Sequence, residues 1–164
     1  MTNVLIAGIG GQGSIFAARV LGETALRGGL NVRGSETIGM AQRGGSVVSH
    51  VRFASSEIAS PMIPPGKADV LVALDATEGE RNNHMLREDG LLVCCNETQR
   101  DEIIAQCGAK SYNAALLGMA AKLNAFPFGV EALAETLRGF GRPQFAELNI
   151  KALYLGAEMT GDQS

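Results

Sequence analysis

A short apolar run near the start of the chain leads directly into a cluster of glycines, giving Val-Leu-Ile-Ala-Gly-Ile-Gly-Gly-Gln-Gly over residues 4–13. An apolar run bounded by glycines predicts a buried strand, here over residues 2–7. The residues after the glycines show helical periodicity as far as Gly28 and Gly29, which predicts a helix over residues 14–27. The chain is therefore constrained to an α/β fold that opens with a strand, a tight turn and a helix.

The same turn fits the pattern Gly-x-Gly-x-x-Gly, in which a dinucleotide pyrophosphate binds at the N-terminus of the helix. Such sites also need an acidic residue about 20 positions further on, which binds the ribose hydroxyls. This chain has Arg-Gly-Gly-Leu over residues 27–30 instead, and Glu36 follows only later. We expect a Rossmann-like first strand, turn and helix without a dinucleotide. A free-standing Rossmann-like nucleotide-binding domain is the alternative hypothesis.

Further predicted strands and helices alternate along the chain. We expect strands over residues 30–33, 46–53, 69–74, 91–95 and 110–112, a hairpin return over 57–60, a loop over 35–45, and helices over 77–87, 98–106, 113–124, 130–137 and from Pro143 onwards. This alternation predicts a three-layer α/β/α fold. The hairpin predicts a mixed, mostly parallel sheet, and the chain length predicts a single domain over residues 1–164.

The composition excludes several classes of function. A net charge of −3 provides no basic surface for nucleic acid. No apolar stretch approaches the roughly 20 residues that cross a membrane, and no basic flank marks a signal peptide. We therefore expect a cytoplasmic protein that binds neither nucleic acid nor membrane.

The residues that usually hold metals are few and poorly spaced. Cys94, Cys95 and Cys107 contain no Cys-x-x-Cys pair, which excludes zinc-ribbon, thioredoxin-like and four-cysteine iron–sulfur sites within this chain. We expect these thiols to be buried. His50 and His84 have no Cys, Asp or Glu at ligand spacing, so we expect no metal site. The sequence also lacks a Gly-x-Ser-x-Gly elbow and a P-loop, and we expect no catalytic residue.

A second glycine-rich segment, Gly-Met-Ala-Gln-Arg-Gly-Gly-Ser over residues 39–46, leads into the strand predicted at 46–53. An arginine between a glutamine and two glycines offers a planar fork of donors beside approachable backbone N–H groups. This arrangement suits a phosphate, a carboxylate or the backbone of a partner. The candidate binding residues of the two glycine segments are Gly10, Gly11, Gln12, Gly13, Gln42, Arg43, Gly44 and Gly45.

With these motifs the chain resembles the gamma-type domain of the 2-oxoacid:ferredoxin oxidoreductases over essentially its whole length. The matching segments are the glycine turn at 8–13, Gly-Met-Ala-Gln-Arg-Gly-Gly-Ser-Val-Val-Ser-His at 39–50, Ser-Pro at 60–61, Ala-Asp-Val-Leu-Val-Ala-Leu at 68–74, Asn113 with Leu117 and Gly118, and Asn149 with Gly156. Pyruvate-type relatives usually carry Glu-x-Arg-Gly-Gly in the middle motif. The version here is most similar to that of the beta subunit of indolepyruvate:ferredoxin oxidoreductase.

The resemblance implies an accessory subunit of an oxidoreductase that decarboxylates a 2-oxoacid on thiamine diphosphate, passes electrons through iron–sulfur clusters to ferredoxin and forms an acyl-coenzyme A. It implies that thiamine diphosphate and the clusters belong to a large partner subunit, through which ferredoxin is reached. This chain would bind no cofactor alone and would not be catalytic alone. Indolepyruvate or another aryl pyruvate is the implied substrate, with pyruvate and 2-oxoglutarate as alternatives. The candidate residues would contact coenzyme A, substrate or the partner.

A small domain with little surface charge is expected to keep an apolar patch for such a partner. Two segments are candidates. One is the helix from Pro143, and the other is the proline-rich crossing at residues 61–65. The predicted apolar stripe of that helix runs through Phe145, Leu148, Ala152, Leu155 and Met159.

We predict that the isolated chain is colourless, contains no iron and binds NAD or FAD at most weakly, because it lacks both the cluster cysteines and the ribose-binding acid. Iron analysis of protein purified without oxygen and calorimetric titration with NAD check this expectation. Stoichiometric iron, or a micromolar dissociation constant for NAD, would contradict it.

We also predict that Arg43→Ala leaves the melting temperature of the isolated chain nearly unchanged but lowers complex affinity or turnover tenfold or more, which is about 1.4 kcal/mol. A surface arginine tolerates Ala within about 0.5 kcal/mol, whereas one bound to a phosphate, carboxylate or carbonyl leaves that group unpaired. Arg43→Lys should restore only part of the loss, because lysine lacks the planar fork. Activity and subunit Kd of the reconstituted complex are the measurements, and wild-type values for both would show Arg43 to be a solvated surface residue.

Overall fold

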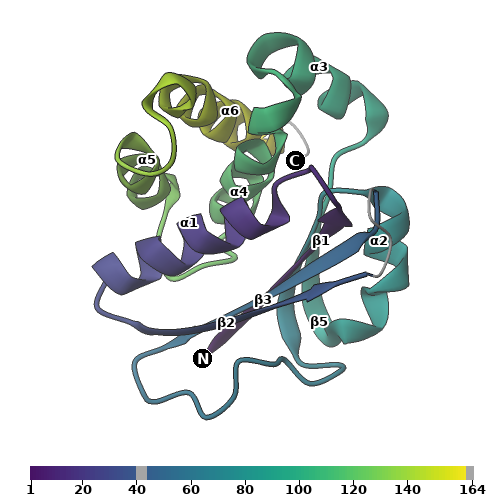
Figure 1. The fold of residues 1–164 in the computed structure, drawn as a ribbon, viewed down its shortest axis with the longest axis vertical. Helices are drawn as coiled ribbons and strands as arrows, with labels where there is room; N and C mark the ends of the chain where they lie inside the picture. The colour runs from purple at the N-terminus through teal and green to yellow at the C-terminus, as the bar shows by residue number, and fades with distance from the viewer. Residues whose placement is uncertain (40–43, 162–164) are drawn as a thin grey trace. The chain divides into compact units, whose positions relative to one another are not determined.

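The computed structural model of the chain describes residues 1–39 and 44–161 (Figure 1). The chain divides into two compact units, Met1–Cys94 and Cys95–Ser164. The first contains the sheet, and the second is helical. The expectation of one domain over residues 1–164 stays a prediction.

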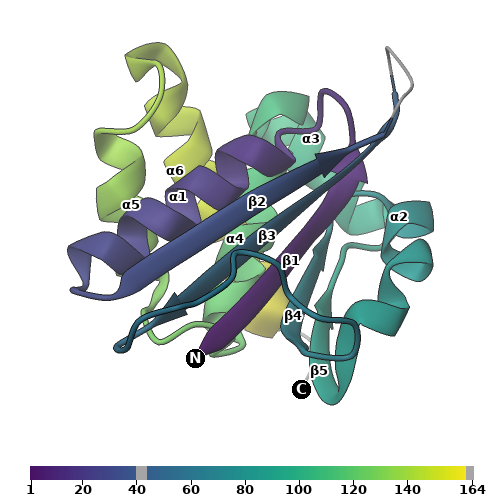
Figure 2. The ribbon, with the colours of Figure 1, turned by 60° about the horizontal axis from the view of Figure 1, so that its bottom comes forward.

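The sheet of the first unit has the strand order β2-β3-β1-β4-β5. Its strands are β1 (Thr2–Ile9), β2 (Asn31–Ile38), β3 (Ser46–Ala54), β4 (Ala68–Ala73) and β5 (Leu86–Val93). β1 pairs in parallel with β4, and β4 with β5, whereas β3 runs antiparallel to both of its neighbours, β1 and β2 (Figure 2). The predicted mixed sheet is confirmed, with β3 as the reversed strand.

The position of β1 in the middle of the sheet explains why its sequence is apolar without alternation. Four successive residues, Val4, Leu5, Ile6 and Ala7, are fully buried. Successive side chains of a strand point to opposite faces, so both faces of β1 are covered. A run of this kind therefore belongs in the middle of a sheet with layers on both sides.

Helices pack on both faces of the sheet. On one face lies α1 (Ser14–Arg27), where the position of a Cβ on Gly22 is 3.4 Å from Val32 of β2. On the other face lies α2 (Ala76–Arg81), where a Cβ on Gly79 would be only 2.8 Å from the Cβ of Ala73 in β4. Figure 2 shows α1 running along β2 and β3. The predicted α/β fold is confirmed, and α1 has the predicted bounds.

The edge strand β2 is longer than its sequence suggests. The expected loop over residues 35–45 is wrong for its first four residues, because β2 continues to Ile38. These residues pair with β3 over the register Ser35↔His50 to Ile38↔Val47. Ser35, Glu36 and Thr37 are polar, and Ile38 is 64% exposed. β2 is an edge strand, and backbone pairing, not apolar periodicity, makes these residues a strand.

The expected hairpin return over residues 57–60 is also wrong, because these residues form no strand. They belong instead to the irregular segment between β3 and β4, which side chains of β3 fix by hydrogen bonds to its backbone. Arg52 Nη1 donates to the carbonyl oxygens of Ser60 and Met62 at 2.9 Å each, and the Ile63 N–H donates to His50 Nδ1 at 3.1 Å. Ile63 is buried, whereas Met62 is 45% exposed and Pro64 and Pro65 are exposed.

Two boundaries around α2 differ from the expected ones. Asp75, not Thr77, caps the helix, and its Oδ1 accepts the Glu78 N–H at 3.0 Å. The helix ends at Arg81, and a single 3-10 turn (Asn83–Met85) leads into β5, which begins at Leu86. The predicted helix over residues 77–87 therefore starts one residue late and ends six residues late, because residues 82–87 form the turn and the first part of β5.

The second unit consists of helices α3 (Glu97–Cys107), α4 (Tyr112–Lys122), α5 (Val130–Arg138) and α6 (Pro143–Gly161). Asn96 and Gln99 form the capping box of α3, which places the start of the helix one residue before the expected Thr98. The expected strand over residues 110–112 is wrong, because Ala109–Ser111 is a 3-10 turn that runs into α4.

The buried face of α6 is not the predicted apolar stripe. The buried residues are Asn149, Ala152, Leu153, Gly156 and Ala157, whereas Leu148 is 40% exposed. This face packs on α4 at very short range. A Cβ on Gly118 of α4 would lie 1.9 Å from the Leu153 carbonyl oxygen. A Cβ on Gly156 of α6 would lie 1.9 Å from the Ala115 carbonyl oxygen. Contact between two backbones, which only small residues allow, selects this face over the one with larger apolar side chains.

No helix in residues 1–39 and 44–161 combines the length and apolar character needed to cross a membrane.

Candidate functional site

The two glycine-rich segments of the sequence meet at one end of the sheet. Gly10, which follows β1, donates its backbone N–H to the Gly45 carbonyl at 2.9 Å. Gly39 donates to the carbonyl of Ser46, the first residue of β3, at 2.7 Å. We call residues 8–13 together with Gly39 and residues 44–46 the glycine junction. Its two parts are far apart in the sequence, and the antiparallel pairing of β1 with β3 brings them together.

Three glycines of the junction adopt a backbone conformation that other residues rarely reach. Gly11, Gly13 and Gly44 have φ angles of 93°, 85° and 66°. Gly8 is required for a different reason, because a Cβ there would lie 2.8 Å from Gln12 Oε1. Substitution of any of these glycines would strain the turn or displace its neighbours.

The junction leads directly into α1, whose N-cap Gly13 provides no side-chain cap. The positive end of the helix dipole and the N–H groups of the first helical turn favour a negatively charged group at such a position. The junction therefore has the chemistry of an anion-binding or backbone-binding surface.

Gln12 binds within its own chain. Its Oε1 accepts the Ile9 N–H at 2.8 Å, and its Nε2 donates to the Leu74 carbonyl at 3.4 Å. The side chain thereby joins the end of β1 to the end of β4. This contact accounts for the shape of the turn and holds the two parallel strand ends at a constant separation.

Six of the eight candidate residues lie in the glycine junction. Gly10, Gly11, Gln12 and Gly13 lie together with Gly44 and Gly45 in the junction. Gln42 and Arg43 lie outside the described residues.

Glu78 is a residue of this region that sequence reasoning missed. It lies in α2, is 3% exposed, and accepts a hydrogen bond from Ser46 Oγ to its Oε2 at 2.7 Å. Its Oε1 accepts from Arg81 Nη1 at 2.8 Å. The spacing of Asp75 and Glu78 was the available signal, because a cap followed three residues later by Glu marks a helix start. Thr77 and Glu80 have the same spacing, and the predicted helix start at residue 77 follows from that pair.

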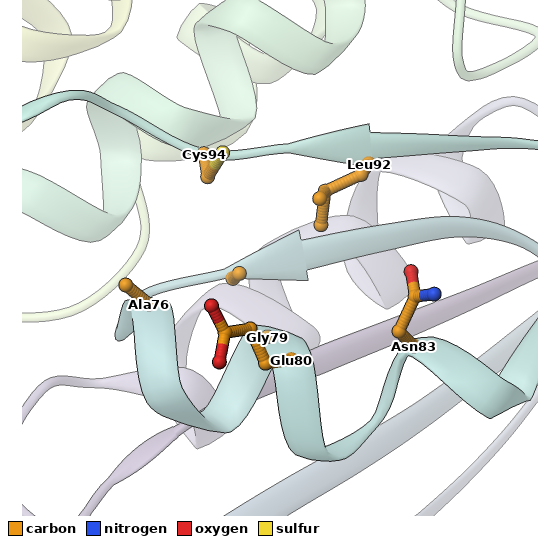
Figure 3. Close-up of a pocket in the computed structure, with 7 residues that line it drawn as sticks. Ala76, Gly79, Glu80, Asn83, Leu92 and Cys94 are labelled. Atoms are coloured by element: carbon orange, nitrogen blue, oxygen red, sulfur yellow. The ribbon is translucent and has the colours of Figure 1, made fainter.

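A second concave surface lies between α2 and β5 (Figure 3). The pocket has a volume of about 440 Å³ and is lined by Ala73, Ala76, Gly79, Glu80, Asn83, Leu92 and Cys94. Figure 3 shows Leu92 and Cys94 on the strand side, facing Ala76 and Gly79 of the helix. Leu92 is 43% exposed, so the pocket opens to solvent.

The cysteines are not uniformly buried as expected. Cys94 is exposed, Cys95 is partly buried and Cys107 is buried. Cys94 directly follows the edge strand β5. Burial raises the pKa of the Cys107 thiol, and nearby Lys151 opposes this shift.

Within residues 1–39 and 44–161, no group of three or more His, Cys, Asp or Glu side chains is placed to hold a metal ion. His84 lies on the surface, and the buried His50 uses Nδ1 to accept the Ile63 N–H.

The topology also argues against a dinucleotide site. In the Rossmann arrangement the second strand lies beside the first, which places its acidic residue near the ribose. Here Glu36 lies on β2, and β3 separates β2 from β1. The glycine turn is Rossmann-like, but the sheet around it is not.

Comparisons with known proteins identify the family of the chain. Residues 3–159 match the family model described as pyruvate ferredoxin/flavodoxin oxidoreductase. The chain is 31% identical to the indolepyruvate oxidoreductase subunit IorB of Archaeoglobus fulgidus, covering 94% of this chain and 92% of that protein. It is 30% identical to IorB of Thermococcus kodakarensis, covering 95% and 94%.

The fold is also that of a solved structure. The gamma subunit of a keto/oxoacid ferredoxin oxidoreductase from Geobacter sulfurreducens matches with a TM-score of 0.79 at 23% identity, covering 99% of both chains.

Proposed function

Because this chain belongs to the pyruvate ferredoxin/flavodoxin oxidoreductase family, we propose that it is the accessory subunit of a 2-oxoacid:ferredoxin oxidoreductase that acts on indolepyruvate or other aryl pyruvates. The reaction would yield acyl-coenzyme A, CO2 and reduced ferredoxin. The observation that carries the substrate class is the identity of about 30% with two IorB subunits, which extends over more than nine-tenths of each chain. Family membership also confirms the resemblance inferred from the glycine motifs.

In this proposal the chemistry belongs to a large partner subunit in the cytoplasm. Thiamine diphosphate would supply decarboxylation there, and iron–sulfur clusters would carry electrons to ferredoxin. The present chain would supply no cluster, since its sequence has no cluster-type cysteine spacing. Its contribution is to complete the assembly and one wall of the site.

The glycine junction is the part of the chain that we propose meets coenzyme A, substrate or the partner. Backbone N–H groups at the start of a helix bind a phosphate or carboxylate without a charged side chain. Gln12 holds the turn in one shape through the Ile9 N–H and the Leu74 carbonyl, so little ordering would be needed on binding.

Co-expression with the large subunit tests the proposal. We expect a stable complex that oxidises indolepyruvate with a low-potential acceptor and requires coenzyme A. Pyruvate and 2-oxoglutarate, assayed in parallel, distinguish the substrate classes. The accessory role is wrong if the two chains purify separately and the large subunit alone has full activity.

A further inference from the structure

Glu78 is a buried carboxylate on a helix of only six residues, α2, most of which is exposed to solvent. Removing a carboxylate from water is costly, and an apolar side chain of similar size usually stabilises such a position as well or better. A charged group held here therefore needs a reason other than the stability of α2.

The partners of Glu78 indicate that reason. One carboxylate oxygen binds Arg81 on the same helix, whose side chain is 63% exposed. The other oxygen accepts the Ser46 hydroxyl at 2.7 Å, a contact between residues 32 positions apart. Of these two contacts, the one with Ser46 joins α2 to the glycine junction.

Ser46 occupies a central position in that junction. It is the first residue of β3 and pairs with Ile9, the last residue of β1. Its carbonyl accepts the Gly39 N–H, and the preceding carbonyl, of Gly45, accepts the Gly10 N–H. The position of the Ser46 side chain is therefore coupled to the position of the backbone that joins the two glycine segments.

The helix that carries Glu78 cannot withdraw from the sheet without loss of contact. Asp75 caps its first turn through the Glu78 N–H, and Gly79 lies so close to Ala73 that an added Cβ would be 2.8 Å away. The Glu78 backbone is thereby fixed at the carboxyl end of β4. The carboxylate then serves as a fixed acceptor for Ser46.

We infer that Glu78 is a positioning residue, which acts through Ser46 to hold Gly44 and Gly45 against the turn at residues 8–13. This positioning role involves only contacts within the chain and does not depend on the proposed function. The consequence for coenzyme A or partner binding rests on the proposed function of the junction.

Amide hydrogen exchange of the full ¹⁵N-labelled chain tests the position directly. The Gly10 and Gly39 amides report the junction, because they donate to Gly45 and Ser46. The Gly79 and Asn82 amides report α2, because they donate to Asp75 and Glu78. For Glu78→Leu we expect the exchange rates of the Gly10 and Gly39 amides to rise, relative to the wild type, at least ten times more than those of the α2 amides.

Three further variants make the test specific. Ser46→Ala should have the same selective effect, and combining it with Glu78→Leu should add little. Glu78→Gln keeps an oxygen that Ser46 can reach, so its effect should be smaller. Glu80→Leu removes an exposed carboxylate from the same helix and should leave the Gly10 and Gly39 amides unchanged.

Two outcomes would overturn the inference. Equal acceleration of all four amides in Glu78→Gln and Ser46→Ala would mean that Glu78 serves global stability only. Unchanged protection of Gly10 and Gly39 in those variants would mean that the junction is held without it.

The reconstituted complex then tests the consequence. Glu78→Gln should raise the KM for coenzyme A or the subunit Kd, with kcat changed less. Selective exchange effects combined with wild-type constants would retain the positioning role but remove the proposed role of the junction in binding.

Discussion

Replacing Gly118 or Gly156 by alanine is expected to destabilise the protein by about 3 kcal/mol or more, because the added Cβ meets backbone and not a movable side chain. Each Cβ would lie 1.9 Å from a carbonyl oxygen of the facing helix, so α4 and α6 would have to move apart. The expected fall in melting temperature is roughly 6–12 °C, at about 2–4 °C per kcal/mol for a chain of this size.

The sign of this effect makes the experiment decisive. In the interior of an ordinary helix, Gly→Ala stabilises by up to about 1 kcal/mol. Gly139→Ala is the matched control, because its Cβ would meet nothing within 4 Å and its φ of −112° suits alanine. We expect that control to lie within about 0.5 kcal/mol of the wild type. Thermal and urea unfolding followed by circular dichroism measure all three variants, and a raised melting temperature for Gly118→Ala would refute the close packing.

The second large effect is a loss of folding stability at acidic pH, which we expect His50 to cause. Burial lowers the pKa of the His50 imidazole, and the neighbouring Arg52 guanidinium lowers it further. The unfolded chain, in which this group titrates near its ordinary value of about 6.5, then binds more protons than the folded chain. Stability is therefore complete above about pH 6.5 and falls as the pH drops below it, by up to about 1.4 kcal/mol per pH unit.

His50 has a structural reason to resist protonation, since its Nδ1 accepts the Ile63 N–H. We expect His50→Gln, which keeps an acceptor, to flatten the dependence of the unfolding free energy on pH between 5 and 7. His84→Gln is the control, because His84 is the other histidine of the chain and lies on the surface. Urea unfolding at several pH values measures the slope. An unchanged slope in His50→Gln would locate the titrating group elsewhere.

The parts of the fold that local sequence determines were predicted well. The apolar run of β1, the glycines after it and the periodicity of α1 are signals within one short segment, and α1 has the predicted bounds of residues 14–27. The family was also identifiable from motifs, because the glycines of the junction meet backbone requirements that few residues satisfy.

Other features depend on segments that meet only in the folded chain. Residues 35–37 are polar and Ile38 is exposed, and all four become strand because β3 offers them hydrogen-bond partners. Cys94 is exposed where it follows β5, although it ends an apolar run that predicts burial. Neither periodicity nor composition carries information about which strand lies at the edge.

The sequence by itself determined the α/β class, the opening strand, turn and helix, and the two glycine segments, since each rests on local backbone preference. Only the tertiary structure decided that those segments join through Gly10 and Gly45, and that Glu78 reaches Ser46. It also decided that α6 turns its glycine face, not its larger apolar stripe, toward α4. The physical reason is that pairing and close backbone contact depend on the partner, and the partner of each residue is set by the topology of the whole chain.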